Sequence, residues 1–244
     1  MAEEPLRRAI IARHSYHHGN LALALVEEAT RMVEAEGLRR FSLRACAKSL
    51  GVDVAAVYRH HASKDALLAA VAEHGSHELV RRILRAIGRP ESGAPAEQFV
   101  AIGRAYVGFA VARPTLYEAV FALRARDARA SSTGTPPRPS RRCASSPPGA
   151  SGPSAWQLLG DCLDRMVEAG EIDATTREGA DLVAWAAVHG LATLINQGLI
   201  DIGGGARERL AEQVCRTVLA GLRNAAPGSA PRHPHAPPRE GSSA

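Results

Sequence analysis

Apolar residues recur along most of the chain at the spacing of amphipathic helices, and no segment alternates as a strand would. Between residues 20 and 36, Leu21, Leu25, Ala29 and Met32 fall on one face, and Gly37 ends the pattern. Comparable patterns begin at Ser42 and Asp53 and extend over 63–88, 96–112, 115–129, 154–169, 175–197 and 206–223. We therefore expect an all-α fold of about nine helices.

The stretch from 38 to 68 combines three helix starts with one tight turn. Ser42, Asp53 and Ser63 each stand where a short polar side chain can cap the first turn of a helix. Gly51 stands where a helix ends on a left-handed glycine, and the next helix starts within a few residues. Two short helices joined by a turn of this kind predict a helix-turn-helix unit.

The charge of the same stretch favours a polyanionic partner. Residues 38–64 contain six Arg or Lys and one acid, a local net charge of +5. The whole chain also carries +5, but residues 124–142 alone account for that value, so global basicity is no argument for DNA binding. The alternative interpretation of the local cluster is an ordinary solvated helix surface that happens to be basic.

Composition divides the chain into unequal parts. We expect a flexible arm at 1–15, a DNA-binding domain with its connecting helix at 16–88, a second helical domain at 96–223 and a disordered tail at 224–244. Within 131–153, fifteen of 23 residues are Ser, Pro or Gly, a composition that cannot bury enough apolar surface to order itself. This insert is either a disordered loop or the product of a reading-frame error.

Several classes of protein are disfavoured. The chain has no apolar run long enough to span a membrane and no signal peptide, which favours a cytoplasmic protein without membrane contact. Its four cysteines lie far apart, its histidines lack ligand partners at metal-binding spacing, and no nucleophile or phosphate-binding motif occurs. We expect no metal, no cofactor and no enzymatic activity.

The motifs of the N-terminal half are YHHGNL at 16–21, SLR at 42–44, the Gly51–Val52 turn, YRHH at 58–61 and SKDALL at 63–68. Together they resemble the N-terminal domain of TetR-family transcriptional repressors, in which a Phe usually replaces His61. In the C-terminal half, Trp185 and VHG at 188–190 resemble the Trp-His-Gly signature of one subgroup, as do Tyr106, Phe109, Pro114, Leu116, Tyr117 and Phe121.

The resemblance implies roles in DNA binding. It assigns phosphate contacts to Ser42, Tyr58, His60 and Lys64, and base contacts to Arg44, Val54, Ala55 and Ala56. The last three side chains can touch thymine methyl groups but cannot form bidentate hydrogen bonds to guanine or adenine. Arg44 and Arg59 are then the candidates for direct base reading. A histidine at 61, where the family packs a Phe into the domain core, is expected to reduce stability.

The resemblance also implies a homodimer that pairs through 175–197 and 206–223, a palindromic double-stranded DNA operator and a small-molecule effector. The candidate effector-binding residues are Phe109, Tyr117, Phe121, Trp156, Met166, Trp185 and His189. The alternative for most of them is a structural role, since aromatic residues at helical spacing are usually core residues and His189 can be a hydrogen-bonded core or interface residue.

Two functions follow as hypotheses. The first is a ligand-responsive, DNA-binding transcriptional repressor. The second is a helical protein that binds a small molecule but has lost specific DNA binding, or a decayed regulator. The apolar start of the second helix, His61 and the insert at 131–153 favour the second hypothesis.

Overall fold

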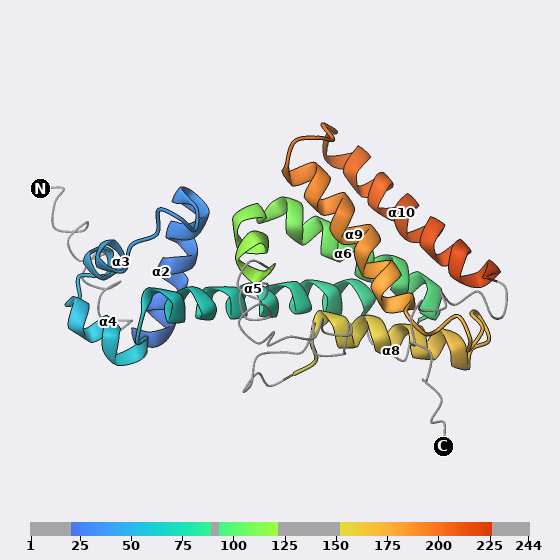
Figure 1. Cartoon of the computed structure of the whole chain (residues 1–244), viewed down its shortest axis with the longest axis horizontal. Coiled ribbons are helices and arrows are strands. Elements are labelled where there is room, and N and C mark those ends of the chain that lie inside the picture. Colours follow the sequence, from blue (N-terminus) through green and yellow to red (C-terminus); the bar gives the residue numbers. More distant parts are fainter. Residues whose placement is uncertain (1–20, 89–92, 122–151, 226–244) are drawn as a thin grey trace, which may run out of the picture.

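The computed structural model describes residues 21–88, 93–121 and 152–225. Within these ranges the chain forms nine helical segments and no strand, which confirms the predicted all-α class. They are α2 (Leu21–Glu36), α3 (Leu43–Ser49), α4 (Val54–His60), α5 (Lys64–Ile87), α6 (Pro95–Ala112), the helical segment 114–121, α8 (Ala155–Glu168), α9 (Ala180–Asn196) and α10 (Gly204–Asn224). In Figure 1, α2–α4 form a small group at one end, and the long α5 connects it to the other helices.

The predicted caps are present in the N-terminal group. The Ser42 hydroxyl accepts a hydrogen bond from the Ala45 amide at 3.5 Å, and the Asp53 carboxylate accepts one from the Ala55 amide at 2.7 Å. Ser63 caps α5 in the same manner, at 3.0 Å. Each side chain satisfies an amide that the first helical turn would otherwise leave unpaired. These short-range bonds fix where the two short helices start.

Gly51 shapes the turn between α3 and α4. Its φ of +67° lies in the left-handed region, where a side chain would be strained. The following Val52 amide donates to the Ala47 carbonyl at 3.0 Å, and the Gly51 amide donates to the Lys48 carbonyl at 3.1 Å. This pair of bonds is the Schellman motif, which closes the end of α3 and turns the chain toward α4. The predicted helix-turn-helix geometry is confirmed.

One continuous core runs through both domains. In the N-terminal domain it contains Leu25, Phe41, Cys46, Val57 and Leu67, all almost completely buried. In the C-terminal domain α6 is central and packs against α5, α8, α9 and α10. Because α5 packs against α2 at one end and α6 at the other, it belongs to both domains. The helix-turn-helix unit is therefore anchored to the C-terminal domain through a shared helix.

Glycine permits the closest helix contact in the C-terminal domain. A Cβ placed on Gly103 of α6 would lie 2.2 Å from the Cys215 sulfur of α10 and 3.2 Å from a methyl of Val188 in α9. Only a residue without a side chain fits at this crossing. The Cys215 thiol is buried, and burial raises its pKa to about 11.

The C-terminal helix bounds differ from the sequence prediction at one place. The helix predicted over 175–197 begins only at Ala180, because Gly179 adopts a left-handed conformation with φ +81°. Before it, the Asp173 carboxylate accepts hydrogen bonds from the Thr175 amide and hydroxyl, at 2.8 and 2.6 Å, and so stabilises a turn. The apolar pattern of 180–196 led to a predicted helix that was extended too far toward the N-terminus. Local hydrogen bonds from polar side chains favour a turn there instead.

Some predictions concern residues outside the described ranges. These are the arm at 1–15, the tail beyond 225, the predicted helix beyond 121 and the insert at 131–153 up to residue 151. In the described ranges, no helix combines the length and apolar character that crossing a membrane requires.

Candidate nucleic-acid interface and effector site

The side chains predicted to meet DNA mostly share one exposed surface of α3, α4 and the start of α5. Those that are exposed are Ser42, Arg44, Ala55, Tyr58, Arg59 and His60. Val54 and Lys64 are half-buried, and the Lys64 ammonium lies 5.8 Å from the centre of the Phe41 ring. The predicted base contact of Ala56 is wrong. Its side chain is only 7 % exposed, because it points inward beside Val57, and so it is not part of this surface.

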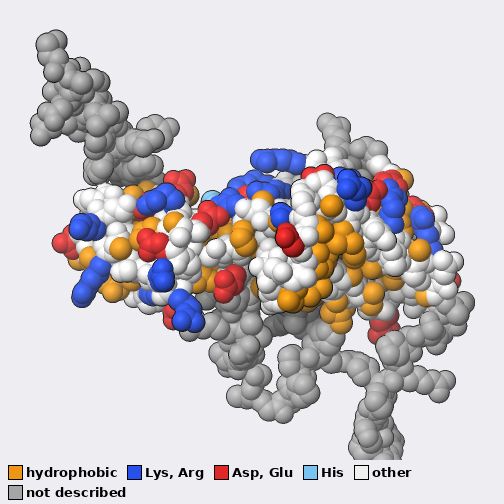
Figure 2. All heavy atoms as spheres, turned by 90° about the horizontal axis from the view of Figure 1, so that it is seen from above, with side chains coloured by type: hydrophobic (Ala, Val, Ile, Leu, Met, Phe, Trp, Pro, Cys, Tyr) orange, Lys and Arg blue, Asp and Glu red, His pale blue; other side chains and the backbone are white. Residues whose placement is uncertain are grey.

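The cations of this surface lack partners within the described parts of the chain. None of the six Arg and Lys residues between 38 and 64 forms an ion pair with another described residue. Outside this stretch, the arginines that do form ion pairs are Arg31, Arg82, Arg104, Arg113, Arg177, Arg216 and Arg223. In Figure 2, Lys and Arg side chains protrude at the end formed by α2–α4. Unpaired cations on a helix-turn-helix suit an anionic partner.

His61 is the weak point of the N-terminal domain. It follows α4 directly and is half-buried, and its Nε2 atom is buried with no hydrogen-bond partner among the described residues. Desolvation lowers the pKa of the imidazole below its usual value, and electrostatic repulsion from the neighbouring His60 lowers it further. A buried polar atom without a partner costs free energy. The structure thus supports the expected stability cost at this position.

Six rings of the C-terminal domain form one aromatic cluster, defined here as Tyr106, Tyr117, Phe121, Trp156, Trp185 and His189. Its centre is His189, whose ring centroid lies 4.7 Å from that of Trp185 and 5.0 Å from that of Phe121. These rings come from α6, α8, α9 and segment 114–121. Five of the seven predicted effector-binding residues are therefore in this cluster, although they are far apart in sequence.

Hydrogen bonds organise the polar atoms of the aromatic cluster. The hydroxyls of Tyr106 and Tyr117 lie 2.8 and 2.7 Å from the Nδ1 atom of His189. Desolvation lowers the pKa of His189 and raises that of Tyr117, and both shifts favour the uncharged form of the group. The arrangement offers flat apolar surface and a few hydrogen-bonding groups, and no described ionised group belongs to it.

Tyr106 was not among the effector-binding residues predicted from the sequence. Its place on the apolar face of α6 suggested only a core residue, yet a buried tyrosine hydroxyl requires a partner, and His189 supplies it. Of the two remaining candidates, Met166 is completely buried in the core. Phe109 is also completely buried, and its ring lies 5.5 Å from the Arg82 guanidinium.

α9 presents an apolar face to solvent. Leu182, Val183 and Leu194 are 40 %, 56 % and 41 % exposed, and the helix contains no charged residue after Asp181. Beside it, α10 carries half-buried Leu210, Val214 and Val218. Hydrophobic side chains gather over the C-terminal domain in Figure 2. An exposed patch of this kind is typical of a protein–protein contact surface.

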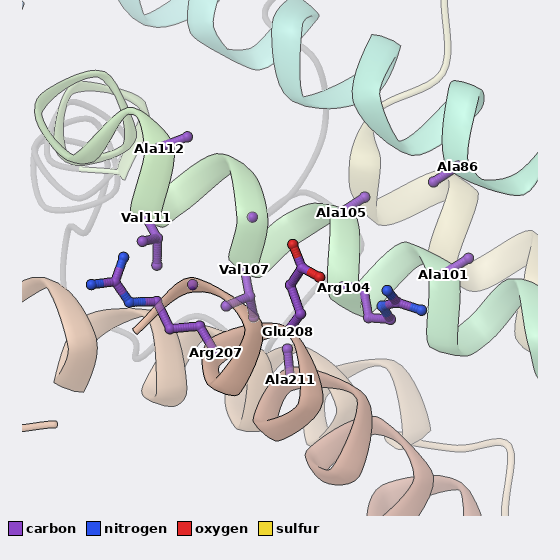
Figure 3. Close-up of a pocket in the computed structure, with 12 residues that line it drawn as sticks. Ala86, Ala101, Arg104, Ala105, Val107, Val111, Ala112, Arg207, Glu208 and Ala211 are labelled. Carbon is purple, nitrogen blue, oxygen red and sulfur yellow. The ribbon is translucent and has the colours of Figure 1, made fainter. Parts of the chain in front are cut away.

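A separate cavity of about 610 Å³ lies between α5, α6 and α10. Figure 3 shows residues that line it, among them the small side chains of Ala101 and Ala105 on α6 and Ala211 on α10, together with the charged Arg104, Arg207 and Glu208. None of the predicted effector-binding residues lines it. The small side chains explain the open space, since neighbouring helices with larger residues would fill it.

Two family models match the chain. The model described as "Bacterial regulatory proteins, tetR family" matches residues 25–71, and "Tetracyclin repressor-like, C-terminal domain" matches residues 99–218. Together they span both described domains. A comparison with curated proteins found no match.

Solved structures share the fold. A protein with unknown function from Rhodococcus sp. RHA1 is 28 % identical, with a TM-score of 0.67 over 85 % of this chain and 98 % of its own. A bacterial regulatory protein in the tetR family from Rhodococcus RHA1 is 18 % identical, with a TM-score of 0.55 over 83 % and 97 %. FadR from Bacillus subtilis in complex with stearoyl-CoA is 11 % identical, with a TM-score of 0.54 over 82 % and 98 %.

Proposed function

The chain belongs to the TetR family of bacterial regulatory proteins, and on this premise we propose that it is a ligand-responsive transcriptional repressor. It binds an operator in double-stranded DNA and leaves it when a small molecule occupies the C-terminal domain. Acting on DNA, it works in the cytoplasm. The observation that carries the proposal is the helix-turn-helix stretch 38–64, whose six cations form no ion pair with a described acid.

DNA contacts divide by chemistry. Ser42, Tyr58, His60 and Lys64 bind phosphates, which fixes the register of the protein on the duplex. Arg44 and Arg59 are exposed, long enough to reach base edges and able to read guanine through two hydrogen bonds. Val54 and Ala55 contribute at most contacts with thymine methyl groups. Specificity therefore depends on few side chains, while affinity depends strongly on salt.

The functional unit is a homodimer. Pairing the apolar faces of α9 and α10 with their copies would remove Leu182, Val183 and Leu194 from water. A twofold arrangement places two recognition helices α4 on half-sites about one helical turn apart, or 34–36 Å, which requires a palindromic operator. The absence of charged residues in α9 after Asp181 suits this buried interface.

The aromatic cluster is the effector site in this proposal. It favours an uncharged or weakly polar molecule with flat or apolar surface, because the rings provide stacking area and His189 provides a hydrogen-bonding atom. The solved relative that holds stearoyl-CoA supports a ligand-binding role for this fold. Phe109 and Met166 are proposed to support the cluster from the core.

A binding experiment tests the proposed function. The purified full-length chain is titrated with its own upstream DNA and with a random duplex at increasing salt, and its mass is measured by size-exclusion chromatography with light scattering. We expect a dimer that prefers the upstream DNA and loses affinity steeply with salt. A folded dimer without salt-sensitive DNA binding contradicts the proposal and favours a protein that binds a small molecule alone. A monomer or an aggregate favours a decayed regulator.

A further inference from the structure

A chain of four charged side chains connects the DNA-binding domain to the C-terminal domain. Arg113 follows the last turn of α6, and its guanidinium forms two hydrogen bonds with the Glu34 carboxylate of α2, one through Nε and one through Nη2 at 2.9 Å. Its Nη1 atom donates to Glu78 of α5 at 2.8 Å, and the other oxygen of Glu78 accepts from Arg82 at 2.9 Å. One guanidinium thus connects three helices.

Partial burial and geometry distinguish this contact from ordinary surface pairs. The side chains of Arg113 and Glu78 are 27 % and 15 % exposed, whereas those of Arg216 and Glu97 are 48 % and 64 % exposed. Two parallel hydrogen bonds between an arginine and a carboxylate also fix their relative orientation. A change in the position of Arg113 therefore changes the position of Glu34 or breaks the pair.

The backbone of Arg113 leads directly to the aromatic cluster. Its carbonyl accepts a hydrogen bond from the Tyr117 amide at 2.8 Å, and the Tyr117 hydroxyl lies 2.7 Å from His189 Nδ1. The same segment, 114–121, packs tightly on α5: a Cβ on Gly75 would lie 2.9 Å from Leu116 and 2.8 Å from Val120. A displacement of Tyr117 by a ligand therefore reaches Arg113 within one helical turn.

We propose that Arg113 is the residue that couples the effector site to the DNA-binding domain. Its pairs with Glu34 and Glu78 set the orientation of α2 and α5, and effector binding at Tyr117 and His189 shifts that orientation through the Arg113 backbone. This inference rests on the proposed function, since it supplies the connection between the two sites that the function requires. Coupling of this kind is reciprocal, so operator binding also alters the aromatic cluster.

Reciprocity permits a test without a known effector. The chain has two tryptophans, Trp156 and Trp185, and both belong to the aromatic cluster, so tryptophan emission reports on the cluster alone. Saturating operator DNA is expected to change the emission of the wild-type dimer. Arg113→Gln and Glu34→Gln are expected to lose most of that change at DNA concentrations that saturate each variant. Arg104→Gln, a control on α6 whose pair with Glu212 stays within the C-terminal domain, keeps it.

The outcomes separate the two proposals. A wild-type chain that binds no DNA contradicts the proposed function. A wild-type chain that binds operator without an emission change, or an Arg113→Gln variant that retains the full change, overturns the coupling role. Hydrogen exchange measured without DNA gives a second criterion: α2 amides should exchange faster in Arg113→Gln and Glu34→Gln than in Arg104→Gln. Equal exchange in all three variants also overturns it.

Discussion

The two domains use charge in opposite ways. On the surface made by α3 and α4, Arg44, Arg59 and their neighbours have no described acidic partner. In the C-terminal domain the arginines instead connect helices, as Arg177 does with Asp164 at 2.6 Å and Arg216 with Glu97 at 3.1 Å. Cations without internal partners do not stabilise the fold, so their role depends on an external anion. Paired arginines serve the architecture instead.

The exposed faces differ in the same sense. The exposed part of α4 carries Tyr58, Arg59 and His60, which suit a hydrated, charged partner. The exposed part of α9 carries Val183 and Leu194, which suit a dry protein surface. This contrast supports the proposal that one domain binds nucleic acid and the other binds a second copy of the chain. Four substitutions test this contrast.

The largest effect is expected from Val183→Glu, which places a charge in the proposed dimer interface. Burying an unpaired carboxylate costs several kcal/mol, so the dimer should dissociate and operator affinity should fall by roughly a hundredfold or more. Light scattering and DNA titration measure the two effects. Ala174→Glu, in the exposed turn before α9, adds the same charge and should leave the mass unchanged. A dimeric Val183→Glu variant would place the interface elsewhere.

Arg44→Ala tests whether the cationic surface reads sequence. It should weaken binding to the operator by roughly 1–3 kcal/mol and binding to random DNA by much less, because a base contact is lost. Arg81→Ala removes an exposed arginine of α5 away from this surface and serves as the control. Equal losses on both DNAs in the competition assay would reassign Arg44 to phosphate contact.

Gly103→Ala tests the closest helix crossing of the C-terminal domain. The new Cβ would overlap the buried Cys215 sulfur, and overpacking of this kind costs roughly 1–3 kcal/mol in urea unfolding. Gly108→Ala in the same helix meets nothing within 4 Å and should instead stabilise the protein by about 0.5–1 kcal/mol. Combining Gly103→Ala with Cys215→Ala should recover most of the loss. A neutral Gly103→Ala variant would mean that α6 and α10 separate easily.

The smallest effect is expected from His61→Phe, which should stabilise the protein by about 1 kcal/mol because it removes a buried nitrogen that has no hydrogen-bond partner in the described ranges. The folded-state pKa of His61 lies below the unfolded value, so the unfolded chain binds the proton first. Wild-type stability is therefore full above about pH 6.5 and falls as the pH is lowered through the unfolded pKa. His61→Phe should reduce this loss of stability, measured by thermal unfolding at several pH values. Part of the loss should remain in the variant, because the pKa of His189 is also lowered. A steeper fall would contradict this assignment.

The N-terminal domain could be predicted from the sequence almost residue by residue, because its geometry depends on local bonds. Ser42, Asp53 and Ser63 cap helices by accepting hydrogen bonds from amides two or three residues further along the chain. The Gly51 amide likewise donates to a carbonyl three residues earlier, that of Lys48. Ala56 was placed wrongly because the match to a family motif gives a position along the helix and not its burial.

The C-terminal site could be predicted only in part. The family resemblance singled out most of the aromatic residues, but their arrangement depends on contacts between residues far apart in the sequence, such as Tyr117 and His189, which lie 72 positions apart. The same holds for Arg113 and Glu34, which lie 79 positions apart and share no sequence pattern. Helical periodicity indicates which face is buried and does not identify the partner.

Because α5 is long, a small rotation at one end of this helix produces a large displacement at its other end. Its 24 residues extend over roughly 36 Å at 1.5 Å per residue. A rotation of about 5° at the end that packs on α6 therefore moves the end that carries the DNA-binding unit by about 3 Å, close to the 3.4 Å rise of one base step. In the proposed dimer both copies of α5 would move in this way, so a rotation of this size would put both recognition helices out of register with their half-sites.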